Sequence, residues 1–166
     1  MSNQRKIILG VVAVMVAGFL ILQVIPGFAR TNPPVQYQVQ WSSPETEALM
    51  RSACYDCHTN ETVWPWYSQI APVSWLVVRD VNEGREELNF SDGTGEIEAD
   101  ELIEKIEKGE MPPNIYKIMH PDASLTADQQ ATLIAGIRAT SFAGIGRGEG
   151  GEGGESHESG EDDRDG

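Results

Sequence analysis

The chain has 166 residues, with 26 acidic and 12 basic side chains and a formal net charge of −14 at pH 7. This length allows one modest domain with short additions. The acidic balance argues against nucleic-acid binding, which needs a basic face. Because there are only two cysteines, the fold cannot be a disulfide-rich scaffold and must rest on a hydrophobic core or a cofactor.

The first apolar run is long enough to cross a membrane. Residues 7–25 contain one polar side chain, Gln23, and would form about 28 Å of helix against a hydrocarbon core of about 30 Å. Arg5 and Lys6 precede the run, which places the N-terminus in the cytoplasm. We therefore expect residues 1–29 to be a single-pass anchor in the inner (cytoplasmic) membrane, with the rest of the chain in the periplasm or otherwise outside the cytoplasm.

A cleaved signal peptide is the alternative for the same segment. Gly27, Phe28 and Ala29 form a small-x-small pattern like that of a cleavage site. The apolar run exceeds the usual signal-peptide core of about 7–15 residues, which favours a retained anchor. Both interpretations export the rest of the chain.

The remaining sequence divides by composition. Residues 30–43 are polar with two prolines and predict an extended linker. Residues 44–143 contain the apolar periodicity of a folded domain. Residues 144–166 are glycine-rich and acidic, and this composition predicts a disordered tail.

The domain is predicted to be all-α. Ser43 followed by Pro44 begins a helix, and Thr126 with Gln129 forms a possible capping box for another. Helices are expected over about 43–53, 72–88, 97–108 and 126–140, with residues 59–71 irregular and no convincing strand.

The helix over 72–88 is expected to bury four apolar side chains that recur at helical spacing, Val73, Leu76, Val77 and Val81. A domain of this size buries a limited core. A large apolar cofactor at its centre would help to explain how so few large apolar residues suffice.

Both cysteines fall in one motif, Cys54-Tyr55-Asp56-Cys57-His58, which is C-x-x-C-H. This pattern is typical of c-type haem attachment. Two thiols three residues apart can reach the two vinyl groups of one porphyrin, and His58 can then offer an imidazole nitrogen to the iron as proximal ligand. We predict one covalent haem c held by Cys54, Cys57 and His58.

Other interpretations of the motif fit less well. A redox disulfide of the thioredoxin type belongs to a βαβ pattern that the sequence lacks. A zinc site needs two more ligands at short spacing, and the other histidines are distant.

The sequence also resembles a known family. The runs ACYDCHTNETVWPWYSQIAPVSW, DVNEGREELNFS, GEMPP and MHPDASLT occur in order within about residues 44–141. They are similar to the haem-binding domain family of bacterial membrane-anchored mono-haem c-type cytochromes. The resemblance implies a small cytochrome c-like helical domain around one covalent haem, an electron-transfer role and an N-terminal membrane segment.

The second axial ligand is predicted to be Met111, in Gly109-Glu110-Met111-Pro112-Pro113. A methionine in a proline-stiffened loop resembles the distal loop of class I cytochromes c, and the prolines help to hold a weak thioether ligand. The alternatives are that Met111 fills the core, or that His120 is the ligand and gives a bis-histidine haem of lower potential. Met119 is a weaker candidate.

These residues favour a membrane-anchored electron carrier over a catalyst. A peroxidase-like enzyme would need a distal base and a catalytic arginine, which the sequence does not clearly show. A gas or redox sensor would need a labile sixth ligand and, typically, a signalling domain. The negative charge predicts a redox protein partner with a basic docking face.

Overall fold

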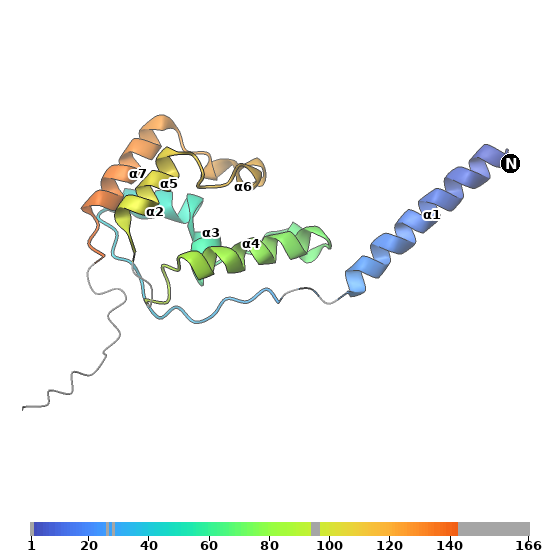
Figure 1. Cartoon of the computed structure of the whole chain (residues 1–166), viewed down its shortest axis with the longest axis horizontal. Coiled ribbons are helices and arrows are strands. Elements are labelled where there is room, and N and C mark those ends of the chain that lie inside the picture. Colours follow the sequence, from blue (N-terminus) through green and yellow to red (C-terminus); the bar gives the residue numbers. More distant parts are fainter. Residues whose placement is uncertain (1, 26, 28, 94–96, 143–166) are drawn as a thin grey trace, which may run out of the picture.

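The computed structural model describes residues 2–25, 27, 29–93 and 97–142. These residues form helices only, with no strand among them, and the all-α prediction is confirmed. The elements, shown in Figure 1, are α1 (Asn3–Val24), α2 (Pro44–Ala53), α3 (Tyr55–His58), η1 (Trp66–Gln69), α4 (Val73–Glu87), α5 (Ala99–Glu107), α6 (Asn114–Met119), η2 (Pro121–Ala123) and α7 (Ala127–Ala139). The predicted tail, residues 144–166, lies outside the described residues.

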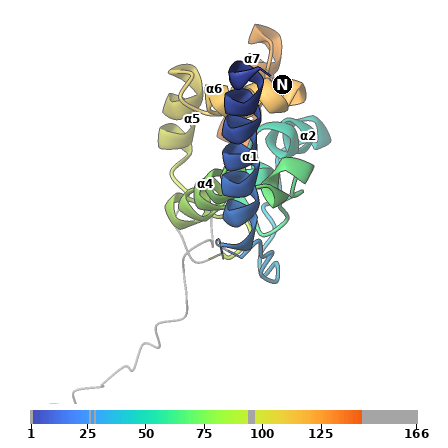
Figure 2. The same ribbon diagram turned by 90° about the vertical axis from the view of Figure 1, so that its right-hand side faces the viewer.

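The apolar helix α1 stands apart from the others. Figure 1 shows it projecting from one side of the domain, and Figure 2, viewed from that side, shows it in front of the remaining helices. It is the one helix within the described residues that is long and apolar enough to cross a membrane, and none of its side chains is buried. A helix that is apolar on every face and buries none of its side chains in the protein is typical of a membrane-spanning segment. The predicted apolar N-terminal helix is therefore present.

The other helices form a small domain in which α7 packs against both α2 and α5, and α3 contacts both α2 and α4 (Figure 1). The core contains ten buried side chains from these helices, the linker and the segment after α4: Val39, Leu49, Met50, Tyr55, Phe90, Ile97, Ile103, Ile106, Leu133 and Ile137. Each such side chain contributes about 1.5–3 kcal/mol by leaving water. Tyr55, which lies between the two cysteines, is part of this core, and Cys54 packs against it, so the core adjoins the cysteine motif.

Both predicted caps are present. The Ser43 hydroxyl accepts a hydrogen bond from the Thr46 N–H at 3.1 Å, and Pro44 occupies the first helical turn. Thr126 and Gln129 form a reciprocal capping box at the start of α7. These local signals fix where α2 and α7 begin, as the sequence predicted.

The linker is extended, and part of it is hydrogen-bonded to the domain. The N–H groups of Gln36 and Tyr37 donate to the Ser91 carbonyl at 2.8 and 3.0 Å, and the Asn60 amide donates to the Pro34 carbonyl at 3.0 Å. Val39 is buried in the core. Residues 34–39 are therefore part of the folded domain rather than a spacer.

The predicted inward face of α4 is half wrong. Val81 is buried as expected and Val77 is half-buried, but both Val73 and Leu76 are exposed. The other buried apolar residue of the helix is Val78, which was not predicted to face inward. The helix is rotated so that Gly84 packs against Cys57. This rotation leaves an apolar strip on α4 that the protein itself does not cover.

Four short elements were not predicted. The cysteine motif forms α3, the segment expected to be irregular contains η1, α6 follows the two prolines after Met111, and η2 follows His120. The apolar residues of α6, Ile115, Ile118 and Met119, are exposed. A single helical turn without a buried face leaves no periodic signal in the sequence.

Close packing of α2 on α7 gives a stability prediction. A Cβ atom at Gly136 would lie 2.0 Å from the Thr46 hydroxyl oxygen, so Gly136→Ala forces the two helices apart. We expect a loss of about 1–3 kcal/mol in the free energy of unfolding, measured by urea denaturation. Ala135→Ser, at an exposed position of the same helix, is the matched control. Equal stability of the two variants would contradict this packing.

Candidate functional site

The cysteine motif forms one helical turn at the end of α2. The Cys54 N–H donates to the Met50 carbonyl at 2.9 Å, and the N–H groups of Cys57 and His58 both donate to the Cys54 carbonyl, at 3.2 and 3.0 Å. Residues three and four apart in a helical turn lie on the same side. The fold therefore presents two thiols and one imidazole together, as the motif predicts.

The ring of His58 is held by a backbone acceptor. Its Nδ1 lies 3.0 Å from the Leu88 carbonyl oxygen, just beyond the end of α4. A carbonyl can only accept, so Nδ1 carries a proton, and in the neutral imidazole the lone pair is then on Nε2. The Phe90 N–H donates to the His58 carbonyl at 2.8 Å, which fixes the backbone of the same residue. An imidazole oriented in this way is the usual arrangement of a histidine that ligates a metal.

Both thiols are free, outside any disulfide, and both residues are half-buried. Burial raises the pKa of the Cys54 thiol to about 12, with a further contribution from Cys57. Burial also raises the pKa of the Cys57 thiol to about 11, and the carboxylates of Asp56 and Asp80 add to the effect while Arg85 opposes it. Both sulfurs therefore carry their protons at neutral pH in the haem-free protein.

Helix α4 reaches the motif through a glycine. A Cβ atom at position 84 would lie 2.7 Å from the Cys57 carbonyl oxygen and 3.1 Å from the Cys57 Cβ. Only glycine allows this approach without displacement of the backbone. The same face of α4 contains Asp80 one turn earlier, and the exposed apolar side chains of Leu76 and Val73 follow two to three turns from Gly84.

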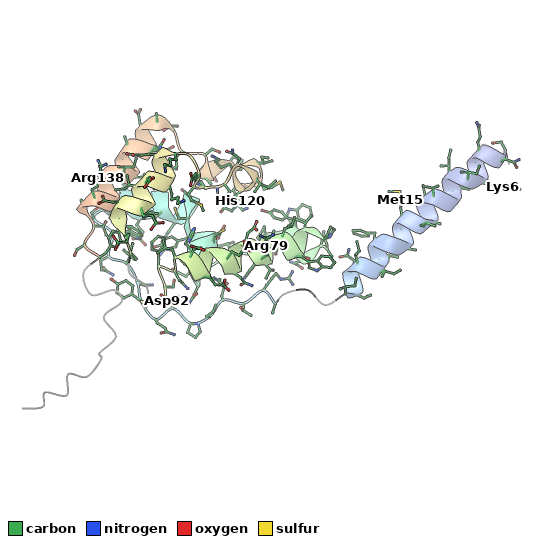
Figure 3. The ribbon with its side chains drawn as sticks, in the orientation of Figure 1. Lys6, Met15, Arg79, Asp92, His120 and Arg138 are labelled. Atoms are coloured by element: carbon green, nitrogen blue, oxygen red, sulfur yellow. The ribbon has the colours of Figure 1, made fainter. Side chains whose placement is uncertain are left out.

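A polar chain connects the motif to α6 and η1. Asp56, between the two cysteines, accepts a hydrogen bond from the Tyr116 hydroxyl at 2.8 Å and one from the Val63 N–H at 2.9 Å. Tyr116 stacks on His120 with ring centroids 4.1 Å apart, and His120 Nε2 lies 2.6 Å from the Tyr67 hydroxyl. Figure 3 shows His120 on the side of α6 that faces α4. Burial raises the pKa of Tyr116, and the hydrogen bond to Asp56 raises it further.

Arg85 ties the motif to the linker. Its guanidinium donates to the Thr59 carbonyl at 2.8 Å and to the Thr62 hydroxyl at 2.7 Å, both just after the motif. It also donates to the Thr31 carbonyl at 2.8 Å and to the Asn32 side chain at 3.0 Å. Sequence reasoning did not identify this role or the Asp56–Tyr116–His120–Tyr67 chain, because both depend on contacts between residues far apart in the sequence.

The candidate distal ligands lie beyond α5. Met111 is in the loop between α5 and α6, where its N–H donates to the Lys105 carbonyl at 3.2 Å, and it is 36% exposed. Met119, at the end of α6, is also exposed. His120 is half-buried and engaged with Tyr67. No contact in the structure joins Met111 to His58, and its assignment stays a prediction.

The residues present fit a haem. Two protonated thiols and an imidazole with a free Nε2 share one turn, and exposed apolar side chains of α4 and α6 are available beside it. Two hollows, of about 290 and 350 Å³, lie elsewhere and are lined by none of Cys54, Cys57 and His58. Within the described residues, no cluster of three His, Cys, Asp or Glu side chains could hold a metal ion, so the zinc interpretation gains no support.

Comparison with known proteins gives one match. A family model described as a haem-binding domain matches residues 17–139, which is most of the chain. Searches of curated proteins and of solved structures found no match.

The raised thiol pKa values predict a pH-dependent reactivity of the haem-free protein. An unfolded thiol has a pKa of about 8.5, so between this value and pH 11 the folded state binds more protons than the unfolded state. The contribution of the two thiols to the free energy of unfolding is therefore fully present below pH 8.5 and is lost as the pH rises through 11–12. At pH 9 we expect iodoacetamide to alkylate folded protein roughly a hundredfold more slowly than urea-unfolded protein. Equal rates would contradict the burial of the two sulfurs.

Proposed function

Because the chain belongs to the haem-binding domain family, we propose that this haem protein is a membrane-anchored c-type cytochrome that transfers electrons. One haem c would be attached through Cys54 and Cys57, with His58 as the proximal ligand. The observation that supports this most directly is the His58 Nδ1 bond to the Leu88 carbonyl, which leaves Nε2 free in the same turn as both thiols. Bound haem supplies a one-electron ferrous–ferric couple.

The chain's own residues prepare the attachment. The two thiols are protonated, as the raised pKa values indicate, and each would add its sulfur and its hydrogen across one vinyl group of the porphyrin, so that no oxidant is consumed. Leu76 of α4 and the apolar side of α6 would then cover the ring and exclude water. Gly84 leaves space for the motif to sit directly on α4.

Met111 is our proposed distal ligand. His120 would have to release the Tyr67 hydroxyl, 2.6 Å from its Nε2, before that nitrogen could bind iron. Met111 pays no such cost, because its thioether lies on a partly exposed loop. Methionine–histidine ligation closes both axial positions and raises the reduction potential. A closed haem of this kind suits an electron carrier better than a peroxidase-like enzyme or a gas sensor.

The anchor and the charge complete the proposal. Helix α1 would span the inner membrane once and leave the haem domain on the periplasmic side, in keeping with Arg5 and Lys6 before the span. The acidic domain would then meet a basic redox partner by electrostatic attraction. Exposed carboxylates on α5, at Asp100, Glu101 and Glu107, are part of the surface available for such docking.

The axial ligands can be tested on the haem-loaded full chain in detergent. We expect the reduced spectrum to be unchanged by carbon monoxide, because a six-coordinate haem has no free position. Met111→Ala should open this position, shift the spectrum on addition of the gas and lower the potential, while His120→Ala should do neither. A wild-type shift with carbon monoxide would favour the enzyme or sensor function. A response confined to His120→Ala would make His120 the ligand.

The docking hypothesis predicts a dependence on salt. With a small basic redox protein as the probe, stopped-flow absorbance should show an electron-transfer rate that falls at least about tenfold between 10 and 300 mM salt, since the screening length shrinks from about 30 Å to below 10 Å. An acidic probe protein is the control and should react faster as salt rises. A rate with the basic probe that is indifferent to salt would contradict the hypothesis.

A further inference from the structure

The last turn of α1 is joined to the haem domain by a pair of hydrogen bonds. The Gln23 side-chain amide donates from Nε2 to the Ala71 carbonyl at 3.1 Å and accepts at Oε1 from the Ala71 N–H, also at 3.1 Å. Ala71 lies in the connection between η1 and α4. The one polar side chain within the apolar run therefore binds both backbone groups of a single residue in the domain.

The segment after α1 is held to the same end of the domain. A Cβ atom at Gly27 would lie 2.5 Å from the Trp75 ring, and the Arg30 guanidinium donates to the Ser68 carbonyl at 2.5 Å. Asn32 then donates to the Thr62 carbonyl at 2.9 Å. The domain is thus held against the end of α1 rather than suspended from a flexible tether.

The domain segment that meets the end of α1 contains no charged side chain. Residues 62–78 contain no Asp, Glu, Lys, Arg or His, in a chain of which 23% is charged. Five of its large apolar side chains are exposed, and three of them are Trp66, at 68%, Ile70, at 36%, and Val73. We call these three residues the end patch. Tryptophan with aliphatic neighbours is the composition found where proteins meet the membrane–water interface.

The length of α1 places the end patch at the level of a lipid surface. From Lys6, at the inner boundary, to Gln23 is about 25 Å of helix at ~1.5 Å per residue, close to the ~30 Å of the hydrocarbon core. Gln23, and Ala71 with it, therefore reaches the outer boundary. Figure 1 shows the start of α4 at the side of the domain that faces α1.

We propose that the end patch inserts into the outer interface of the membrane that α1 spans, so that the haem domain lies against the lipid surface. This inference rests on the proposed anchor. An acidic domain is repelled by anionic lipid, and residues 62–78, its longest uncharged segment, can approach without this cost. The occupant of the patch is therefore lipid, at the boundary of headgroups and acyl chains.

This placement fixes the distance between the cysteine motif and the lipid surface. Helix α4 has Val73 at one end and Gly84, packed on Cys57, near the other. Eleven residues of helix separate them by about 16 Å. The cysteine motif would thus be held within about 16 Å of the lipid surface, and electron exchange would take place with a partner at or in the membrane rather than far from it.

Photo-labelling in a bilayer tests this placement. The full chain, haem-loaded, is placed in nanodiscs of phosphatidylcholine and phosphatidylglycerol that contain a phosphatidylcholine with a diazirine near the carbonyl end of one acyl chain. After illumination, the labelled residues are mapped by peptide mass spectrometry. We expect label on α1 and on residues 62–78, and none on α7, which lies away from α1 (Figure 1).

Two variants separate the end patch from the anchor. Trp66→Asp with Ile70→Asp should reduce label on residues 62–78 roughly tenfold, because carboxylates disfavour insertion, and should leave label on α1 unchanged. Ala135→Asp, at an exposed position of α7, is the matched control and should change nothing. Gln23→Leu keeps the span apolar and loses both bonds to Ala71, so label on residues 62–78 should also fall. This variant leaves the domain surface intact if the double variant fails to fold.

Each outcome bears on the inference. Label on α1 with none on residues 62–78 of the wild type would overturn it and leave the anchor standing. Label on residues 62–78 that survives both the double variant and Gln23→Leu would overturn it too, since contact would not depend on the patch. Absence of label on α1 would remove the anchor and the inference together.

Discussion

The site depends on the hydrogen bond between His58 Nδ1 and the Leu88 carbonyl. It fixes the tautomer of the ring and joins the short helix α3 to the end of α4. Because α4 also packs on Cys57 through Gly84, the turn with both cysteines is held from two sides. A helix of four residues has little stability of its own, so the orientation of the thiols comes from α4 rather than from α3.

The same helix connects the site to the linker that follows α1. Arg85, on α4, binds carbonyl groups both at Thr59, after the motif, and at Thr31, in the linker. The linker is thereby part of the architecture of the site. A displacement of the linker relative to the domain would disturb the segment after the motif, because the Arg85 guanidinium is bonded to both. Hydrogen bonds thus link α1 to the connection just before α4, and the linker to the cysteine turn.

Local signals in the sequence predicted much of this. The caps at Ser43 and Thr126, the apolar span of α1 and the C-x-x-C-H motif each depend on neighbouring residues, and the structure contains all of these elements. The inward face of α4 was partly wrong because periodicity identifies an apolar stripe without identifying what covers it. A cofactor and a lipid surface, like a core, select apolar residues. Val73 and Leu76 therefore looked like core residues and are exposed.

Contacts between distant segments could not be predicted. Asp56 and Tyr116 are 60 residues apart, and Tyr67 and His120 are 53 apart, so nothing in either local sequence indicates their hydrogen bonds. These contacts bear on the sixth ligand, because they engage His120 and leave Met111 unconstrained by such a bond. The sequence left two candidates for this ligand, and the tertiary contacts of His120 favour Met111.

The central claim, covalent attachment of one haem by this turn, is tested most directly by the intact mass of the denatured protein. The full chain is exported in a host with c-type maturation machinery and unfolded in acid before mass spectrometry. We predict a mass raised by one haem, no thiol left to alkylate, and loss of the added mass in the variant with both Cys54→Ala and Cys57→Ala. An unchanged mass with two alkylatable thiols would contradict the account.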